Sequence, residues 1–126
     1  MERLSGTVAV VEDDPSMRRS VQRLLSAHGF PTEGFPSAEA FLGRNSASRI
    51  DCLVLDVDLR GMSGIALQRQ LRDIGSALPI IFITALEDST LEAEAVKAGC
   101  IAYLHKPFPA SLLINAINSA LASASE

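Results

Sequence analysis

Two aspartates, Asp56 and Asp58, end a hydrophobic run in the segment LVLDVDLRGMSG, residues 53–64. A carboxylate at the end of a buried strand is costly unless a cation or hydrogen-bond donors compensate its charge. Other polar residues also stand at the ends of apolar runs: Glu12, Asp13, Asp14, Thr84 and Lys106. These residue types could together carry out chemistry on a phosphoryl group.

The chemistry follows from what each group offers. Two or three carboxylates in one crevice repel each other and need a cation at neutral pH. Oxygen ligands without histidine or cysteine favour Mg²⁺. Lys106 supplies a compact positive charge suited to a phosphoryl oxygen, and Thr84 can donate a hydrogen bond to another. Asp56 among such groups is a candidate nucleophile toward phosphorus.

Hydrophobic periodicity predicts the elements that position these residues. Apolar runs predict strands at residues 7–12, 31–35, 52–56, 79–84 and 100–104. Three-to-four spacing and capping residues predict helices at 15–28, from Ser37 through Leu42, at 64–73, 89–98 and from 109 or 110 to 122. Alternating strands and helices imply an α/β fold, a parallel sheet with helices on both faces. The carboxyl ends of such strands share one edge, where the polar residues converge.

Composition excludes several classes of protein. The chain has 126 residues, which suits one domain, and its net charge of -4 gives no reason to expect direct binding of nucleic acid. It shows neither a membrane-spanning run nor a signal-peptide pattern, so a cytoplasmic protein is expected. Cys52 and Cys100 lack metal-site spacing and are predicted to be small buried hydrophobes without a disulfide. We expect a core at about 6–122, with 123–126 a tail or the start of a linker.

The sequence resembles the receiver domain of two-component response regulators over essentially its whole length. VAVVEDDPSMRRSVQRLL resembles the family's first strand, acidic pair and first helix, and LVLDVDLRGMSG its phosphoacceptor segment. FITA and AYLHKPF resemble its hydroxyl-bearing strand end and its lysine-proline segment. The resemblance implies a flavodoxin-like, five-stranded parallel sheet of order 2-1-3-4-5. PSAEAFL is most similar to receivers attached to helix-turn-helix output domains, the NarL/FixJ-like regulators.

The resemblance also implies a role for each acid. Asp56 would accept a phosphoryl group from a partner sensor histidine kinase. Glu12 and Asp13 would hold Mg²⁺, with Asp56 and the backbone carbonyl of Asp58 completing the protein ligands. The domain would then be a phosphorylation switch that controls an output such as transcription. It would not be an enzyme, although it would assist its own phosphorylation and dephosphorylation.

Three further residues complete the implied site. Thr84 and Lys106 would bind the phosphoryl group, and Thr84 and Tyr103 would change position on activation. The Lys106–Pro107 peptide bond would be cis. The fourth helix, fifth strand and fifth helix would form a homodimer or output surface, with the output domain absent or in a longer chain.

Several positions depart from the commoner family pattern. Glu12 replaces an aspartate and is one methylene longer, so it could reach the metal through water. Asp14 is predicted to cap the first helix, and the side chain of Asp58 to point outward. Leu59 and Arg60 stand where the family usually has Met-Pro. Loss of proline, together with Gly61 and Gly64, predicts a freer loop with a solvated arginine.

Three other interpretations compete with a phosphorylated receiver. Haloacid-dehalogenase-like phosphatases share the Asp-x-Asp pattern, but they place metal-binding acids after the lysine, where this chain has only Glu126. A flavin-binding flavodoxin-like module needs a phosphate loop after strand one, where the acids of this chain would repel phosphate. A degenerate receiver that acts by binding alone is kept open by Arg60.

Overall fold

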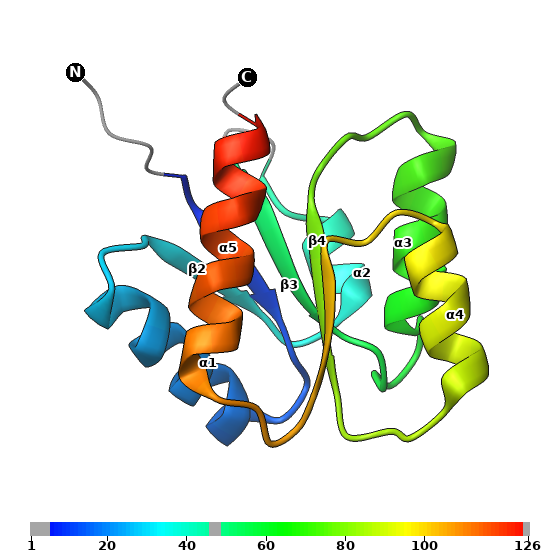
Figure 1. The fold of residues 1–126 in the computed structure, drawn as a ribbon. Coiled ribbons are helices and arrows are strands. Elements are labelled where there is room, and N and C mark those ends of the chain that lie inside the picture. The colour runs from blue at the N-terminus through cyan, green and yellow to red at the C-terminus, as the bar shows by residue number, and fades with distance from the viewer. Residues whose placement is uncertain (1–5, 46–48, 125–126) are drawn as a thin grey trace.

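Five parallel strands form one sheet with helices on both faces in the computed structural model, which describes residues 6–45 and 49–124 (Figure 1). The strand order is β2-β1-β3-β4-β5, which confirms the predicted fold. The strands are β1 (Val8–Val11), β2 (Thr32–Phe35), β3 (Cys52–Asp56), β4 (Ile80–Thr84) and β5 (Ala102–His105). The helices are α1 (Pro15–Ala27), α2 (Ala38–Leu42), α3 (Gly64–Asp73), α4 (Ser89–Lys97) and α5 (Ala110–Ala124).

Polar residues before the helices fix where these begin. The Asp14 carboxylate accepts a hydrogen bond from the backbone N–H of Ser16, so Asp14 is the predicted cap of α1. The hydroxyl of Ser37 caps α2 by accepting from the N–H of Ala40. These caps orient the helices that follow β1 and β2, and thus the loops that carry the acids.

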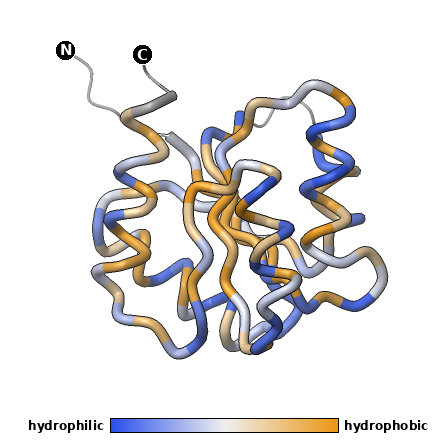
Figure 2. The backbone as a smooth tube through the Cα atoms, turned by 45° about the vertical axis from the view of Figure 1, so that its right-hand side comes forward, coloured by the Kyte–Doolittle hydropathy of each residue, from blue (hydrophilic) through white to orange (hydrophobic). Residues whose placement is uncertain are grey.

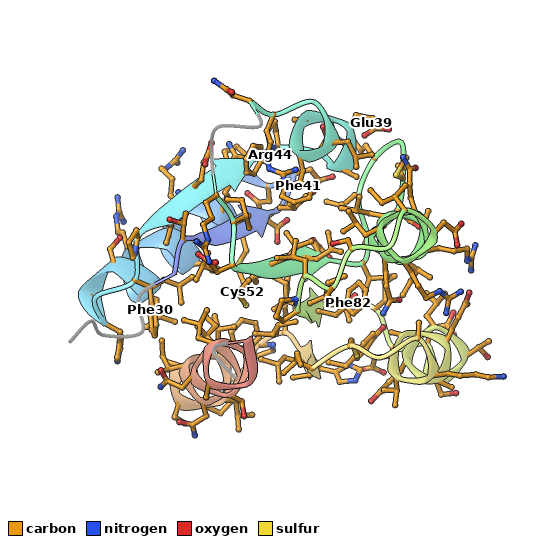
Figure 3. The ribbon with its side chains drawn as sticks, turned by 90° about the horizontal axis from the view of Figure 1, so that it is seen from above. Phe30, Glu39, Phe41, Arg44, Cys52 and Phe82 are labelled. Carbon is orange, nitrogen blue, oxygen red and sulfur yellow. The ribbon has the colours of Figure 1, made fainter. Side chains whose placement is uncertain are left out.

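Alternate side chains of the strands pack into two hydrophobic layers. On one face the buried residues join α2, α3 and α4 through Ala9, Val11, Phe35, Phe41, Leu53, Leu55, Leu67, Leu71, Phe82 and Ala95. On the other face they join α1 and α5 through Val8, Val10, Val21, Leu25, Cys52, Val54, Ile81, Ile83, Leu113 and Ile117. The strands at the centre of Figure 2 are accordingly hydrophobic, and Figure 3 shows the helices on both sides of the sheet. The face of the sheet on which a strand side chain lies therefore follows from its position in the alternation.

The fifth strand begins two residues later than the predicted range of 100–104. Gly99 takes a positive φ of 97° after α4, and the N–H of Cys100 donates to the carbonyl of Ala95. Cys100 thus still closes the helix and cannot enter the sheet. The apolar run CIAYL spans a helix end and a strand, which periodicity does not separate.

One apolar residue near the start of α5 is exposed. Leu113, Ile117 and Leu121 are buried, but Leu112 is 48% exposed because it lies about 100° around the helix from Leu113. The helix continues to Ala124, into the expected tail, and residues 125–126 lie outside the described residues. Across the described ranges, the structure contains no helix both long and apolar enough to cross a membrane.

The two cysteines are free thiols. Cys52 is fully buried, as predicted, and burial raises its pKa to about 12. Its thiol is therefore protonated and unreactive near neutral pH. Cys100 is half-buried rather than buried, because it follows the end of α4 instead of lying inside the sheet.

Candidate functional site

The register of the sheet brings the first acid beside the predicted phosphoacceptor. Val11 pairs with Leu55 across β1 and β3, so Glu12 follows β1 at the level of Asp56. Glu12 follows Val8 and Val10, and Asp56 follows Cys52 and Val54, in the alternation of side chains that face α1 and α5. Both acids are almost completely buried, with exposed fractions of 1% for Glu12 and 4% for Asp56. Two carboxylates thus share one end of the sheet with little water around them.

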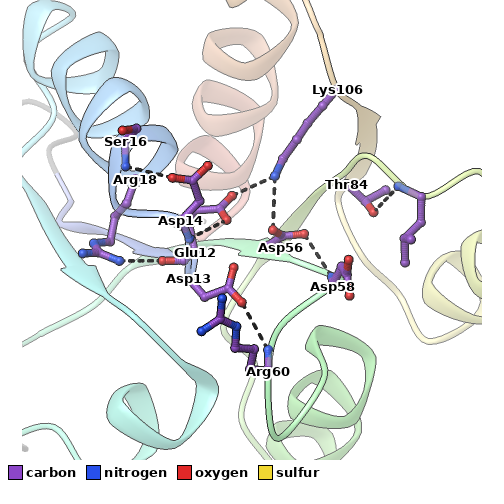
Figure 4. A network of polar contacts seen from close by, with 11 residues as sticks. Glu12, Asp13, Asp14, Ser16, Arg18, Asp56, Asp58, Arg60, Thr84 and Lys106 are labelled. Atoms are coloured by element: carbon purple, nitrogen blue, oxygen red, sulfur yellow. Dashed lines mark hydrogen bonds and ion pairs between the residues drawn. The ribbon is translucent and has the colours of Figure 1, made fainter.

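Three carboxylates form a cluster at this edge. Ligand oxygens of Glu12, Asp13 and Asp56 all lie within 4.8 Å of one another (Figure 4). Such a cluster of hard oxygen donors with excess negative charge fits a divalent cation such as Mg²⁺. The described residues therefore bring together the three acidic side chains predicted for the metal site.

Lys106 offsets part of this charge from the loop that follows β5. Its Nζ lies 2.8 Å from Oε1 of Glu12 and 3.1 Å from Oδ2 of Asp56. Burial favours the neutral amine, but the two carboxylates outweigh it and raise the pKa of Lys106 above its ordinary value. The Lys106–Pro107 peptide bond is cis, the geometry that the resemblance implies.

The Asp56 carboxylate is held at both oxygens. Oδ1 accepts a hydrogen bond of 3.0 Å from the backbone N–H of Asp58, and Oδ2 is bound by Lys106. The Asp58 side chain is exposed, so the two aspartates separate as predicted. Asp56 is the fixed carboxylate within the cluster, whereas Asp58 contributes its backbone.

Close packing under the site depends on Gly64. A Cβ at this position would lie 2.3 Å from the backbone oxygen of Asp56 and 2.9 Å from Cα of Val57. Only glycine lets α3 begin so close to the end of β3. Its role is therefore space for packing, and not the freedom predicted for the loop.

Glu12 has an unusual affinity for protons. Burial raises its pKa, the Lys106 ammonium lowers it, and neighbouring Asp56 raises it again, which leaves a pKa of about 7. The backbone N–H of Asp14 also donates to Oε2 of Glu12 at 3.2 Å. The cluster thus binds a proton more readily than free carboxylates do, and a cation would compete with that proton.

Glu12→Gln is expected to flatten the pH dependence of stability. In the folded protein Glu12 titrates near pH 7, but it titrates near 4.5 when unfolded, so the folded state binds more protons between these values. The contribution of Glu12 to stability is therefore present below about pH 4.5 and falls as pH rises toward 7, by roughly 1–3 kcal/mol. Urea unfolding at pH 5 and pH 8 without divalent ions measures this slope. Glu87→Gln, at an exposed position, is the control; an unchanged slope in Glu12→Gln contradicts the prediction.

Thr84 and Tyr103 lie toward the other face of the sheet. Thr84 is fully buried at the end of β4, and its hydroxyl accepts a hydrogen bond of 2.9 Å from the backbone N–H of Leu86. The Tyr103 ring lies 5.8 Å from that of Phe82. Its buried hydroxyl has no hydrogen-bond partner among the described residues, and burial raises its pKa. Tyr103 therefore packs in the hydrophobic layer that includes Ala95 of α4, and the Thr84 hydroxyl contacts loop backbone rather than the acids.

Several contacts near the site carry no clear signal in the sequence. The Arg18 guanidinium donates to the backbone carbonyl of Glu12 at 2.7 Å, and Glu39 accepts from the backbone N–H of Met62 at 2.9 Å. His105 contacts the Glu92 carboxylate at 3.1 Å, so it links β5 to α4. An arginine or glutamate on a helix looks the same in sequence whether or not it supports a loop.

The chain matches the response regulator receiver domain family over residues 8–118. This match covers both acid segments, Thr84 and Lys106, and it distinguishes the chain from dehalogenase-like phosphatases and flavodoxins. The acidic cluster is typical of the magnesium site of receivers. Receivers are signalling domains rather than enzymes, and they imply a cognate histidine kinase.

Relatives point to one group of regulators. The chain is 40% identical to the transcriptional regulatory protein TdiR of Thauera aromatica, over 94% of this chain and 52% of TdiR. The crystal structure of FixJ-N is 36% identical with a TM-score of 0.85, covering 96% of this chain and 95% of that one. The response regulator StyR is 44% identical with a TM-score of 0.87, over 94% and 60%. The chain spans about half the length of the curated relatives it matches. It belongs to the response regulator receiver domain family, and within that family it is most similar to regulators of the FixJ and StyR type.

Proposed function

We propose that this domain is a phosphorylation switch in which Asp56 accepts a phosphoryl group from a sensor histidine kinase. One observation carries the proposal: the nearly buried Asp56 carboxylate is held by Lys106 and the Asp58 N–H beside two further acids. A carboxylate fixed in this way, with an adjacent cation site, suits in-line attack on phosphorus.

In the proposed reaction an Asp56 carboxylate oxygen attacks the phosphorus of a phosphohistidine. The new O–P bond forms as the P–N bond breaks, and its electron pair returns to the imidazole nitrogen of the kinase. Lys106 holds an equatorial phosphoryl oxygen, and Thr84 donates a hydrogen bond to another once its hydroxyl leaves the Leu86 backbone. Glu12, Asp13, Asp56 and the backbone carbonyl of Asp58 would hold Mg²⁺, which would supply positive charge to neutralise the phosphoryl oxygens.

The output surface in this proposal is formed by α4, β5 and α5. Movement of Thr84 toward the phosphoryl group frees space beside Tyr103, whose rotation shifts the packing of α4. Exposed apolar side chains occur on all three segments of this surface or directly beside them: Val96, Ile101 and Leu112. Their burial between two copies of the domain would stabilise a homodimer.

The wider role follows from the relatives. Because the related regulators are about twice as long, we infer that this receiver, with its core at about 6–122, acts with a helix-turn-helix output domain in a longer chain. Nucleic acid would then be bound by that output domain. The free thiols of Cys52 and Cys100 support a cytoplasmic location, where thiols stay reduced.

Acetyl phosphate tests the proposal without the kinase. Incubation with Mg²⁺ should add one phosphoryl group to the intact protein, as seen by mass spectrometry, and excess chelator should prevent the addition. Absence of the adduct with Mg²⁺ present would leave a receiver that acts by binding alone. If the phosphoryl group is added equally well in excess chelator, the metal has no role in the mechanism.

A further inference from the structure

The loop after the phosphoacceptor is tied directly to one of the metal acids. The backbone N–H of Arg60 donates a hydrogen bond of 3.2 Å to Oδ2 of Asp13, from 47 residues further along the chain (Figure 4). Asp13 is half-buried in the loop that follows β1, and Arg60 is exposed. The contact thus joins the two segments that must both be in place around a cation.

The same loop has a second anchor on α2. The N–H of Met62 donates to Oε2 of Glu39, and this bond lowers the pKa of Glu39 below its ordinary value. Between the two anchors Gly61 takes a positive φ of 73°, and a Cβ there would lie 2.7 Å from the Glu39 carboxylate. Two carboxylates, one on each side, therefore define the path of the loop.

The bond to Asp13 depends on the residue type at position 60. Proline has no N–H, so the Met-Pro pattern commoner in the family cannot make it. In this chain the restraint of a proline ring is replaced by a hydrogen bond to a carboxylate. The replacement links the loop to the acid cluster instead of stiffening the loop by itself.

The bond also restrains Asp13. A carboxylate on a short side chain has two oxygens, and holding one of them limits rotation of the whole group. With Oδ2 bound by the Arg60 N–H, Oδ1 remains available to a cation beside Glu12 and Asp56. A ligand oriented before the metal arrives loses less freedom on binding, and binding is tighter for that reason.

We propose that the backbone amide of Arg60 is a positioning group for the magnesium site, which it serves by orienting the Asp13 carboxylate. The inference rests on the proposed function, because it assumes that the cluster binds Mg²⁺. It makes metal affinity sensitive to the conformation of the 59–63 loop, and loop conformation sensitive to the metal.

Arg60→Pro and Arg60→Ala separate the amide from the side chain. Both variants lose the guanidinium, but only Arg60→Pro loses the N–H. Mg²⁺ titrations by calorimetry, without phosphodonor, are expected to show about three- to tenfold weaker binding for Arg60→Pro and an affinity within about twofold of the original for Arg60→Ala. Urea unfolding of the metal-free proteins should show Arg60→Pro folded but somewhat less stable than the original, because proline removes an N–H that is hydrogen-bonded to Asp13.

Each other result has a definite meaning. Equal Mg²⁺ affinity in all three proteins overturns this inference but leaves the proposed function standing. Equal weakening in both variants assigns the effect to the guanidinium and overturns it too. No Mg²⁺ binding by any of the three removes the metal site, and the inference with it.

A second measurement does not require the proline variant to fold. In ¹H–¹⁵N spectra of the metal-free protein, the Arg60 amide proton should move upfield in Asp13→Ala because it loses a charged acceptor. Asp14→Ala removes a neighbouring carboxylate and serves as the control. An Arg60 amide that shifts equally little in both variants has no bond to Asp13 in solution, which contradicts the inference.

Discussion

Asp56→Asn is expected to abolish phosphorylation by acetyl phosphate, whereas Asp58→Asn is expected to retain it. An amide oxygen in place of the carboxylate is a far weaker nucleophile toward phosphorus. Asp58 contributes a backbone N–H to the site and has an exposed side chain, so its substitution leaves the attacking group unchanged. Intact mass after incubation with Mg²⁺ and acetyl phosphate measures both, and peptide mapping locates the adduct.

Loss of labelling in Asp56→Asn could also result from unfolding, so the stability of the variant must be measured. Asp56→Asn removes one of three clustered negative charges, so its stability should not fall, and urea unfolding checks this. Folded Asp56→Asn that is still labelled would show that Asp56 is not the acceptor. Labelling that disappears only in Asp58→Asn would transfer that role to Asp58.

Lys106→Ala is expected to slow phosphorylation about a hundredfold, since removal of one preorganised charge-stabilising donor typically costs that much. It should also destabilise the metal-free protein at pH 7 by roughly 1–3 kcal/mol, because the buried Glu12 and Asp56 carboxylates lose their counter-charge. Mass-spectrometric time courses give the rate, and urea unfolding gives the stability.

Mg²⁺ distinguishes the two effects of Lys106→Ala. A divalent cation in the acid cluster should recover much of the lost stability but not the lost rate, because the lysine contact to the phosphoryl group is still missing. Lys97→Ala, on the exposed surface of α4, is the control and should change neither. A Lys106→Ala protein that is phosphorylated at the original rate contradicts the role assigned to this residue.

Much of the fold could be predicted because strands and faces follow local rules. Apolar runs located β3 and β4, and the shared carboxyl edge of parallel strands placed Glu12 and Asp56 at the same end of the sheet. The prediction was less accurate where one run crosses two elements. Cys100 was predicted to be in a strand but closes α4 instead, because backbone hydrogen bonding there is decided by Gly99.

The candidate site was harder to predict in its contacts than in its members. Sequence position indicates that Lys106 reaches the acid cluster, but not that it binds Glu12 as closely as Asp56. The support from Arg18 and Glu39 depends on the path of loops and on side-chain rotamers, neither of which periodicity reports. The sequence shows that Arg60 departs from the Met-Pro pattern of the family, but only the structure shows that its amide binds the Asp13 carboxylate.

The contacts of Lys106 have a consequence for the order of folding. Its partners lie 94 and 50 residues earlier in the chain, so both ion pairs form only after large loops close. A partly folded chain in which β1 and β3 pair before β5 is added would hold the acids together without their lysine, and addition of β5 would relieve their repulsion. Mutations at Lys106 should therefore change the unfolding rate more than the folding rate, as expected for contacts formed after the transition state.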